Sequence, residues 1–264
     1  MTAIAARHRA AWAASDYWEM AKRSLRHIRH DPEQLGNVTI TPVLLVLLMR
    51  FLFGGAINTG THGSYINFAM PGIFVVTAAF AAASTTVSVA ADMHEGVIDR
   101  FRTLPIAKGS VITGHVIADL VRSLLGVAVT VGVGYAIGFR PSAGIGGWAA
   151  AVGVILLVTF GLSWLDALIG LVGGSVEVAQ QLGAIVVIPV FLSSALVPAA
   201  TMPSWLRVIT ANQPFNQAID SIRALLAGQP PGSHLWLAAA EFAGIIAAAF
   251  TLATVLFRRE QRPG

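Results

Sequence analysis

The feature that most constrains this chain is a series of apolar runs, each long enough to cross a lipid bilayer. The run at 65–91 contains no formally charged residue. A helix rises about 1.5 Å per residue, so roughly 20 apolar residues span the hydrocarbon core. Only 11% of the 264 residues are charged, whereas soluble proteins average about 25%. Most of the surface of the folded chain is therefore expected to face lipid, and the chain is not expected to fold around one hydrophobic core in water.

Six such runs follow one another and leave little room for a separate soluble domain. Backbone polar groups in lipid must be satisfied within one segment, so we expect helices and not strands. The predicted fold is an all-α polytopic membrane protein with six transmembrane helices. Only Glu177 separates the fourth run from the fifth, which requires a tight turn there. The predicted spans are 38–57, 65–91, 111–139, 148–176, 178–197 and 235–257.

Basic residues are divided unequally between the segments that flank the spans. Segments 1–37, 92–110 and 258–264 hold twelve Lys and Arg residues, whereas the other three loops hold three. Because Lys and Arg are enriched on the cytoplasmic side, both termini are predicted to be cytoplasmic in a multi-pass protein of the cell (plasma) membrane. The chain then divides into a cytoplasmic N-terminal segment (1–37), a transmembrane domain (38–257) and a cytoplasmic tail (258–264).

The N-terminal segment has the pattern of a helix that lies in the membrane surface. Apolar residues recur at helical spacing from Trp18 to Ile28, basic residues cover the other face, and Pro32 ends the pattern. A basic amphipathic helix just before a span favours the headgroup plane. The alternative is an ordinary solvated helix of a small domain, for which the neighbouring sequence offers no core.

The segment between the fifth and sixth spans is too regular for a simple loop. Apolar residues repeat at helical spacing from Phe215 to Leu226, behind Pro214 and before Gly228. A shorter apolar patch precedes them. We expect two short helices at about 203–228, broken just before the second, on the outer face of the membrane. Such helices are tolerated as re-entrant pieces where protein or a cavity covers the broken backbone.

A second amphipathic pattern follows the second span, at about 92–105. Asp92 and Glu95 have the spacing of a capping box, and Pro105 ends the pattern. Its apolar stripe consists of Met93, Val97, Phe101 and Leu104. The pattern predicts a short helix at the cytoplasmic surface, whose stripe either rests on lipid or docks into a groove of a cytoplasmic protein.

These two segments resemble those of the type-2 ABC exporter permeases. The loop at 92–105 resembles the family's coupling helix, with matches at Glu95, Gly96, Arg100, Leu104 and Pro105. The later segment is similar to the family's fifth-span end and external hairpin. The hairpin positions that match are Pro198, Met202, Pro203, Trp205, Asn212, Pro214, Asp220 and Arg223. Within the family the chain is most similar to daunorubicin-resistance-type permeases, which export drugs or complex lipids. It departs from the family at Gln213, in an Asn-Gln-Pro stretch, and at Arg50.

The resemblance implies a dimer of permeases, identical or homologous, bound to two ABC ATPase subunits. The chain has no G-x-x-x-x-G-K-[ST] motif, so ATP and Mg²⁺ are expected in a separate ATPase subunit and no cofactor in this chain. Membrane lipid is the other expected partner. Nucleic acid is not expected, since the basic residues flank membrane spans. The residues expected to couple to the ATPase are Glu95, Gly96, Val97, Arg100, Phe101 and Pro105.

Charged residues inside the predicted spans are candidates for a substrate path, because each costs about 3 kcal/mol at the bilayer centre. Asp119 and Arg122 are three residues apart and are predicted to pair. Asp166 either pairs with an arginine such as Arg122, or is a counter-charge for a cationic substrate or a step in a proton path. Glu241 is expected at the outer interface. Arg50 attracts an anionic group or pairs with Glu241. The candidate substrate path is therefore Arg50, Asp166 and Glu241.

The predicted function is that of the permease subunit of an ATP-driven exporter for a hydrophobic or amphiphilic drug, secondary metabolite or lipid. Multidrug or antibiotic resistance is the associated role. The alternatives are a permease for a lipid-linked glycan and a non-transporting membrane sensor or scaffold with the same fold. An enzyme is not expected, because the chain has no cysteine and its seven histidines are scattered, so no catalytic or metal-binding constellation is predicted.

Overall fold

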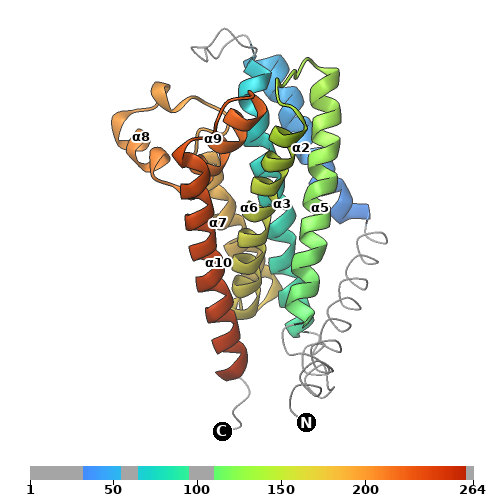
Figure 1. Ribbon diagram of the computed structural model, residues 1–264. Helices are drawn as coiled ribbons and strands as arrows, with labels where there is room; N and C mark the ends of the chain where they lie inside the picture. Colours follow the sequence, from blue (N-terminus) through green and yellow to red (C-terminus); the bar gives the residue numbers. More distant parts are fainter. Residues whose placement is uncertain (1–31, 55–64, 95–109, 260–264) are drawn as a thin grey trace, which may run out of the picture.

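The computed structural model describes residues 32–54, 65–94 and 110–259, and every regular element within them is a helix (Figure 1). The predicted N-terminal helix that precedes Pro32 lies outside the described residues. Pro32 itself begins a helix, as its fixed φ and missing N–H allow in a first turn. In chain order the elements are α2 (Pro32–Leu48), the π-helical turn η1 (Met49–Phe53), α3 (Tyr65–His94), α5 (Ser110–Ala136), α6 (Ile145–Val172), α7 (Val176–Phe191), the 3-10 turn η2 (Ala199–Thr201), α8 (Ser204–Ala211), α9 (Pro214–Leu226) and α10 (Ser233–Arg259).

Four of these helices are long and apolar enough to cross a membrane. They are α3, α5, α6 and α10, whose apolar stretches have 30, 25, 28 and 24 residues, and they coincide with the predicted second, third, fourth and sixth spans. The predicted first and fifth spans correspond to shorter apolar helices, Ile40–Phe53 and Val176–Phe191. The chain is therefore an all-α, multi-pass membrane protein.

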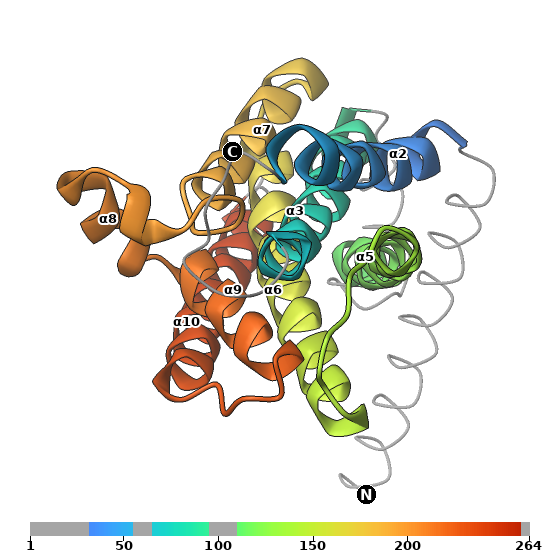
Figure 2. The same cartoon turned by 90° about the horizontal axis from the view of Figure 1, so that it is seen from above.

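The central helix of the bundle is α3. It contacts α2, α5, α6, α7 and α9, and Figure 2 shows these helices around it. A helix that is apolar on all sides can be buried on all sides. Accordingly, Ile66, Ile73 and Phe74 of α3 are fully buried. By contrast, α10 lies at the periphery and packs on α6 and α9.

Gly72 allows α3 to touch the backbone of the connection that follows α7. A Cβ atom built on Gly72 would lie 2.1 Å from the carbonyl oxygen of Ala195 and 2.4 Å from its Cα. Such distances are far inside van der Waals contact, so only glycine fits here. The position of Gly72 thus fixes the turn that leads from α7 towards α9.

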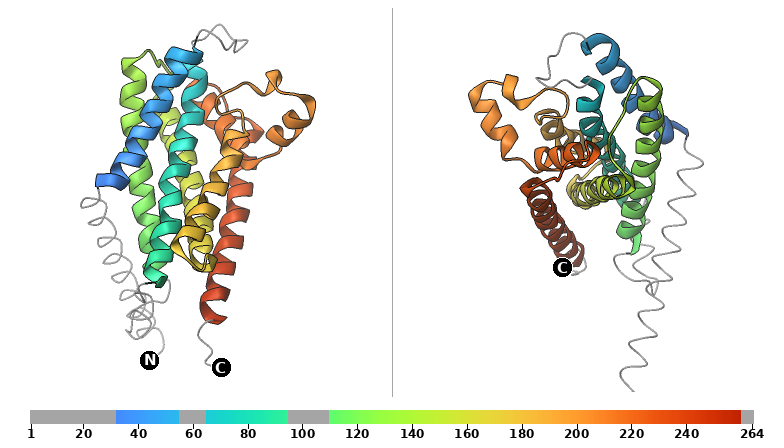
Figure 3. Two further views of the ribbon diagram at one scale, coloured as in Figure 1. Left: turned by 180° about the vertical axis from the view of Figure 1, so that it is seen from behind. Right: turned by 45° about the horizontal axis from the view of Figure 1, so that its top comes forward.

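The long helices alternate in direction, which gives the bundle two distinct ends (Figures 1 and 3). One end, which we call the α9 end, holds η1, the start of α3, and the short helices α8 and α9. The other end, which we call the His94 end, holds the end of α3, the start of α5 and the turn between α6 and α7. At the α9 end, α8 projects sideways from the bundle.

The connection between α6 and α7 is a tight turn, as the sequence predicts. Gly174 has a φ of +67°, a conformation that favours glycine. Ser175 caps α7, because its Oγ accepts the N–H of Val178 at 3.2 Å. Hydrogen bonds from its own backbone N–H and from Ser175 lower the pKa of the exposed Glu177 carboxyl. The helix boundaries lie at Val172 and Val176.

Candidate functional site in two buried polar networks

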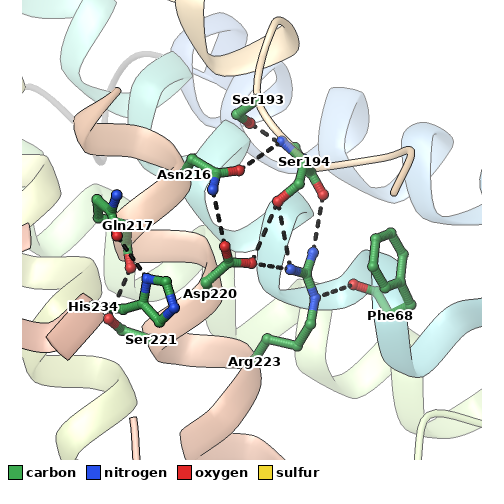
Figure 4. A network of polar contacts seen from close by, with 10 residues as sticks. Phe68, Ser193, Ser194, Asn216, Gln217, Asp220, Ser221, Arg223 and His234 are labelled. Atoms are coloured by element: carbon green, nitrogen blue, oxygen red, sulfur yellow. Dashed lines mark hydrogen bonds and ion pairs between the residues drawn. The ribbon is translucent and has the colours of Figure 1, made fainter. Parts of the chain in front are cut away.

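The first polar network joins α9 to the connection that follows α7, and we call it the α9 network (Figure 4). Its members are Ser193, Ser194, Asn216, Asp220 and Arg223. Asp220 and Arg223 are three residues apart on one face of α9 and form an ion pair. One turn earlier, Asn216 donates from Nδ2 to Oδ2 of Asp220 at 2.9 Å. The sequence periodicity that predicts α9 therefore also places its polar residues together.

Arg223 extends this network to two other parts of the chain. Its Nη2 donates to the backbone oxygen of Ser194 at 2.9 Å, and its Nε donates to the backbone oxygen of Phe68 on α3 at 3.4 Å. The guanidinium carbon also lies 4.1 Å from the centroid of the Phe68 ring, a cation–π contact. Burial lowers the pKa of Arg223, and the adjacent charge of Asp220 raises it. Arg223 thus holds three segments at one point.

The irregular backbone after α7 finds its hydrogen-bond partners on α8 and α9. Oδ1 of Asn216 accepts the N–H of Ser194 at 3.0 Å, and the Thr210 hydroxyl donates to the carbonyl oxygen of Leu192 at 2.7 Å. Broken backbone at membrane depth is stable only with such partners. The short helices therefore complete the end of α7.

The predicted hairpin residues divide between this network and the ends of helices. Asp220 and Arg223 form its charged pair. Pro198 and Pro203 directly precede η2 and α8, and Pro214 is the first residue of α9. Proline has no N–H to lose at a helix start, which explains these positions.

The remaining hairpin residues lie on or near α8. The Met202 sulfur accepts a hydrogen bond from the Thr210 hydroxyl at 3.4 Å. Asn212 follows α8 and donates from Nδ2 to the carbonyl oxygen of Val208 at 2.8 Å. Trp205 is 66% exposed on α8. Two short helices separated just before Pro214 thus occur where the sequence predicts them.

The second polar network lies among α3, α5 and α6 in the half of the bundle nearer the His94 end, and we call it the inner network. Its members are Ser84, Thr85, Thr86, Asp119, Arg122 and Asp166. Nη1 of Arg122 lies 2.5 Å from Oδ1 of Asp119, so the predicted ion pair is confirmed. Thr85 also donates to Asp119, and Arg122 also donates to the Ser84 hydroxyl. Both charged groups are buried.

Asp166 contributes to the inner network without a cationic partner. Its Oδ1 lies 2.9 Å from Oγ1 of Thr86 on α3, and the residue is only 1% exposed. The predicted ion pair between Asp166 and Arg122 is wrong, because Arg122 binds Asp119 instead. No ion pair within the described segments includes Asp166. A substrate could therefore reach this carboxyl only after α3 and α6 move apart.

The elements that carry Arg50 and Glu241 lie on different sides of the bundle, since η1 continues α2 whereas Glu241 belongs to α10 (Figure 2). Arg50 is exposed on η1, next to α2, which packs on α3 and α5. Glu241 is half-buried on α10, which packs on α6 and α9. The predicted pair between them is therefore wrong within one chain. One carboxylate oxygen of Glu241 is buried and has no hydrogen-bond partner among the described residues.

The predicted coupling residues lie outside the described segments, although the end of α3 directly before them is described. Asp92 lies within α3 and not at the start of a separate helix, and its Oδ2 is 3.0 Å from Nε2 of His115 on α5. His94 Nε2 is 3.1 Å from the carbonyl oxygen of Gly174 in the α6–α7 turn. These contacts tie the end of α3 to α5 and to the start of α7. The coupling residues outside the described segments are Glu95, Gly96, Val97, Arg100, Phe101 and Pro105.

A pocket of about 240 Å³ opens beside this end of α3. It lies between the last turns of α3 and the α6–α7 turn, so it adjoins the segment predicted to couple to an ATPase. Its lining residues are Ala90, Met93, His94, Gly170, Leu171, Gly174 and Ser175. The mainly small and apolar lining would suit a hydrophobic side chain better than a charged group.

Sequence reasoning identified the charged members of both networks but did not predict which hydroxyl and amide groups bind them. Thr85 and Thr86 stand in an apolar run, where threonine is unremarkable by itself. Asn216 and Ser194 likewise carry no charge that would mark them. The one available signal for Asn216 is its spacing of four residues before Asp220, which puts both on the same face of a helix.

Comparison with known proteins identifies the family. Residues 15–227 match the family of ABC-2 type transporters. The chain is 31% identical over 239 residues to the daunorubicin resistance ABC transporter permease protein DrrB1 of Streptomyces coeruleorubidus, which covers 90% of this chain and 84% of that protein.

Two further relatives are permeases by name. The probable doxorubicin resistance ABC transporter permease protein DrrC of Mycobacterium tuberculosis is 22% identical over 191 residues, 72% of this chain and 69% of that protein. The putative transport permease ycf38 of Porphyra purpurea is 29% identical over 208 residues, 77% of this chain and 71% of that protein. The family match covers most of this helical membrane bundle, and the relatives are permeases by name. The chain is therefore a type-2 ABC permease and belongs to the ABC-2 type transporter family.

Proposed function

We propose that this chain is the transmembrane subunit of an ATP-driven exporter that moves a hydrophobic or amphiphilic drug, secondary metabolite or lipid out of the cell. The observation that carries the proposal is the similarity, over 239 residues, to a permease whose name specifies daunorubicin resistance. The apolar interior of the bundle is consistent with such a substrate, since its largest buried side chains are Phe, Ile, Leu, Val and Met.

The proposed topology has six spans, with α2–η1 and α7 as the two short ones. In this topology the His94 end faces the cytoplasm, together with both termini, and α8 and α9 lie at the outer face. The supporting observation is the bias of twelve Lys and Arg residues against three between the two sets of flanking segments. The proposed domains are 1–37, 38–257 and 258–264, as in the sequence division.

Coupling to ATP hydrolysis is proposed to pass through residues 92–105. In this proposal two copies of a separate ATPase subunit bind ATP and Mg²⁺, and each docks against Glu95, Phe101 and their neighbours. The contacts of Asp92 with His115 and of His94 with Gly174 support this route. Because they join α3 to α5 and to the start of α7, a displacement of this end would reach three helices.

A second permease, identical or homologous, is proposed to cover the face formed by α2 and η1. Phe51 and Leu52 are 73% and 69% exposed there, next to the exposed Arg50. An arginine on a lipid-facing surface is unfavourable, whereas at a subunit boundary it can face water, a substrate or the other permease. Arg50 would then line a substrate path between the two permeases, while Glu241, on the opposite side, would have to act separately.

Disulfide cross-linking would test this interface, because the chain contains no native cysteine. In membranes, Phe51→Cys should form a covalent dimer upon mild oxidation. The matched control is Phe250→Cys, an exposed phenylalanine on the peripheral helix α10. Dimers from the α10 variant and none from the η1 variant would refute the proposed interface.

The function itself is tested by purification of the tagged chain from its own membranes in mild detergent. A P-loop ATPase should come with it, and Glu95→Ala with Phe101→Ala should abolish this association, whereas Trp205→Ala at the other end should not. Daunorubicin should then stimulate ATP hydrolysis by the reconstituted complex at least severalfold. Association without stimulation by any amphiphile would favour the sensor or scaffold, and stimulation only by a lipid-linked glycan would favour that alternative.

A further inference from the structure

Asp166 and Thr86 form a closed contact between the two helices that pack most extensively on each other, α3 and α6. Oγ1 of Thr86 lies 2.9 Å from Oδ1 of Asp166 and 3.2 Å from the backbone oxygen of the same residue. Thr86 is fully buried and Asp166 is 1% exposed. Every polar atom in this contact must therefore be satisfied by its neighbours and not by bulk water.

The number of protons in this contact indicates the charge of the carboxyl group. The hydroxyl of Thr86 has one proton to donate, yet two acceptor oxygens of Asp166 lie within hydrogen-bond distance. If Asp166 is ionised, the single Thr86 proton must be shared between the two oxygens. If Asp166 is protonated, its O–H donates to Oγ1 of Thr86, and Thr86 donates to the backbone oxygen. The protonated form thus gives each contact its own proton.

The surrounding charges favour the same form. Arg122 of α5 binds Asp119, so two ionised carboxylates would leave the inner network with a net negative charge inside the membrane. Asp119 and Asp166 are both carboxyl groups of the inner network, so their negative charges would repel each other. The other titratable or charged side chains described on the packing helices lie towards the bundle ends: Tyr65, Asp92 and His94 on α3, His115 and Tyr135 on α5, Glu177 on α7, Asp220 and Arg223 on α9, and His234 and Glu241 on α10.

Two glycines let α6 and α7 approach Thr86 closely. A Cβ atom built on Gly183 of α7 would lie 2.9 Å from Oγ1 of Thr86. One built on Gly170 of α6 would lie 2.8 Å from the backbone oxygen of Thr86. The backbones of α6 and α7 therefore pack directly against Thr86, the residue that contacts the Asp166 carboxyl.

We propose that Asp166 is an intramembrane proton-binding site, occupied in this conformation and closed by Thr86, Gly170 and Gly183. When α3 and α6 separate, water enters, accepts the proton and leaves the carboxylate hydrated. The conformation with the two helices apart therefore binds this proton more weakly. A rise in pH shifts the protein towards the conformation in which α3 and α6 are apart. This linkage does not depend on the identity of the transported substrate.

Infrared spectroscopy of the full-length chain in lipid nanodiscs near neutral pH tests the proposal. A protonated carboxylic acid has a carbonyl stretch apart from those of carboxylates and amides. The wild-type spectrum should contain such a band, and Asp166→Asn should remove it. Thr86→Val should shift the band, because the acid then loses its hydrogen-bond acceptor. Glu241→Gln controls for a half-buried carboxyl elsewhere in the bundle and should leave this band in place.

The proposal is overturned if Asp166→Asn removes only carboxylate absorbance, or if the band persists in that variant. Folding provides a second readout. The amide of Asn can donate to Thr86 as the protonated acid does, so Asp166→Asn should have the wild-type thermal unfolding midpoint where Asp166 is protonated. As the pH rises, the midpoint of the wild type should fall, whereas that of Asp166→Asn should not. An Asp166→Asn chain that cannot fold, while Glu241→Gln folds normally, would also contradict a neutral Asp166.

Discussion

At the scale of single residues, two arginines of the bundle meet an aspartate three positions earlier on the same helix. Arg122 binds Asp119 on α5, and Arg223 binds Asp220 on α9. Residues at this spacing share a helix face, so each pair forms as soon as its helix forms. Each arginine then uses its remaining donors on groups of other segments, such as the Ser84 hydroxyl or the Ser194 carbonyl. Local pairing thus precedes the tertiary contacts.

Asp119→Asn should destabilise the protein strongly, because Arg122 would remain buried without its counter-charge. Loss of one partner of a buried ion pair costs about 3–5 kcal/mol. Thermal unfolding in detergent, followed by size-exclusion chromatography, should show a lower midpoint. Combining Asp119→Asn with Arg122→Met should restore most of the loss, since no charge is then buried. A single variant as stable as the wild type would be inconsistent with the observed pair.

Gly72→Ala should also destabilise the protein, because the new methyl group would overlap the backbone of Ala195. Overpacking of this kind costs about 1–3 kcal/mol, and here the atoms that must move belong to the backbone. The control is Gly132→Ala on α5, where no atom lies within 4 Å of the built Cβ. That change should stabilise the helix by up to about 1 kcal/mol. Equal midpoints for both variants would disprove the close approach.

At the scale of elements, α9 packs on α6 and α10, and its polar face reaches the end of α7 and the start of α3. Arg223 makes four contacts with these two segments, three through its guanidinium hydrogen bonds and one through the Phe68 ring. The planar fork of the guanidinium is needed for this geometry, and a lysine ammonium cannot reproduce it. The attachment of α9 therefore depends on shape as well as on charge.

Arg223→Lys should loosen α9 although it preserves the charge. Hydrogen–deuterium exchange of residues 193–227 should become faster by an order of magnitude or more, as expected if about 1.4 kcal/mol or more of local stability is lost. Arg207→Lys is the matched control, because Arg207 donates to carbonyl oxygens from an exposed position on α8. Equal acceleration in both variants would mean that the α9 network does not hold the helix.

The sequence predicted the long helices well because each is an uninterrupted apolar run, but it misjudged where several of them end. α3 continues past Ala91 to His94, since Asp92 faces His115 across the bundle. α7 stops at Phe191 and not at Val197, because Gly72 and the α9 network hold the next residues in a turn. These ends are decided by neighbours in space, which a local pattern does not contain.

The candidate site was predictable only where its partners lie on one helix. The Asp119 and Arg122 pair follows from a spacing of three residues. The contact of Asp166 with Thr86 joins residues 80 positions apart, so it depends on how α3 and α6 are packed. The alternative in which Asp166 pairs with Arg122 failed because Arg122 pairs with Asp119 on its own helix.

At the scale of the whole molecule, the two ends of the bundle differ in character. The α9 end is capped by short helices and has exposed apolar side chains, including Trp205 on α8 and Trp236 near the start of α10. Tryptophan is enriched at the interface between lipid and water, so this end is suited to lie at one membrane surface. The His94 end has the compact α6–α7 turn with Glu177 exposed. This contrast makes the orientation directly measurable.

Single-cysteine labelling should reveal the orientation, again because the chain has no cysteine of its own. Trp205→Cys should react with a membrane-impermeant maleimide in intact cells. Glu177→Cys, at the opposite end, should react only after the membrane is permeabilised. Both positions are exposed, so a difference in labelling reports sidedness and not burial. The reverse pattern would invert the proposed topology.

The central position of α3 has a consequence for biogenesis. The helix is synthesised before α5, α6, α7 and α9, yet these are the helices that later surround it. During translation, Thr85 and Thr86 therefore lie beside the insertion machinery or in lipid until α5 and α6 have been synthesised. In that period their hydroxyls can hydrogen-bond only to their own helix. A nascent chain that ends after α5 would expose Thr86 and the surface around Gly72, whose partners Asp166 and Ala195 follow α5 in the chain. Quality-control proteases should recognise such truncated chains, whereas a chain completed through α9 would have covered both surfaces.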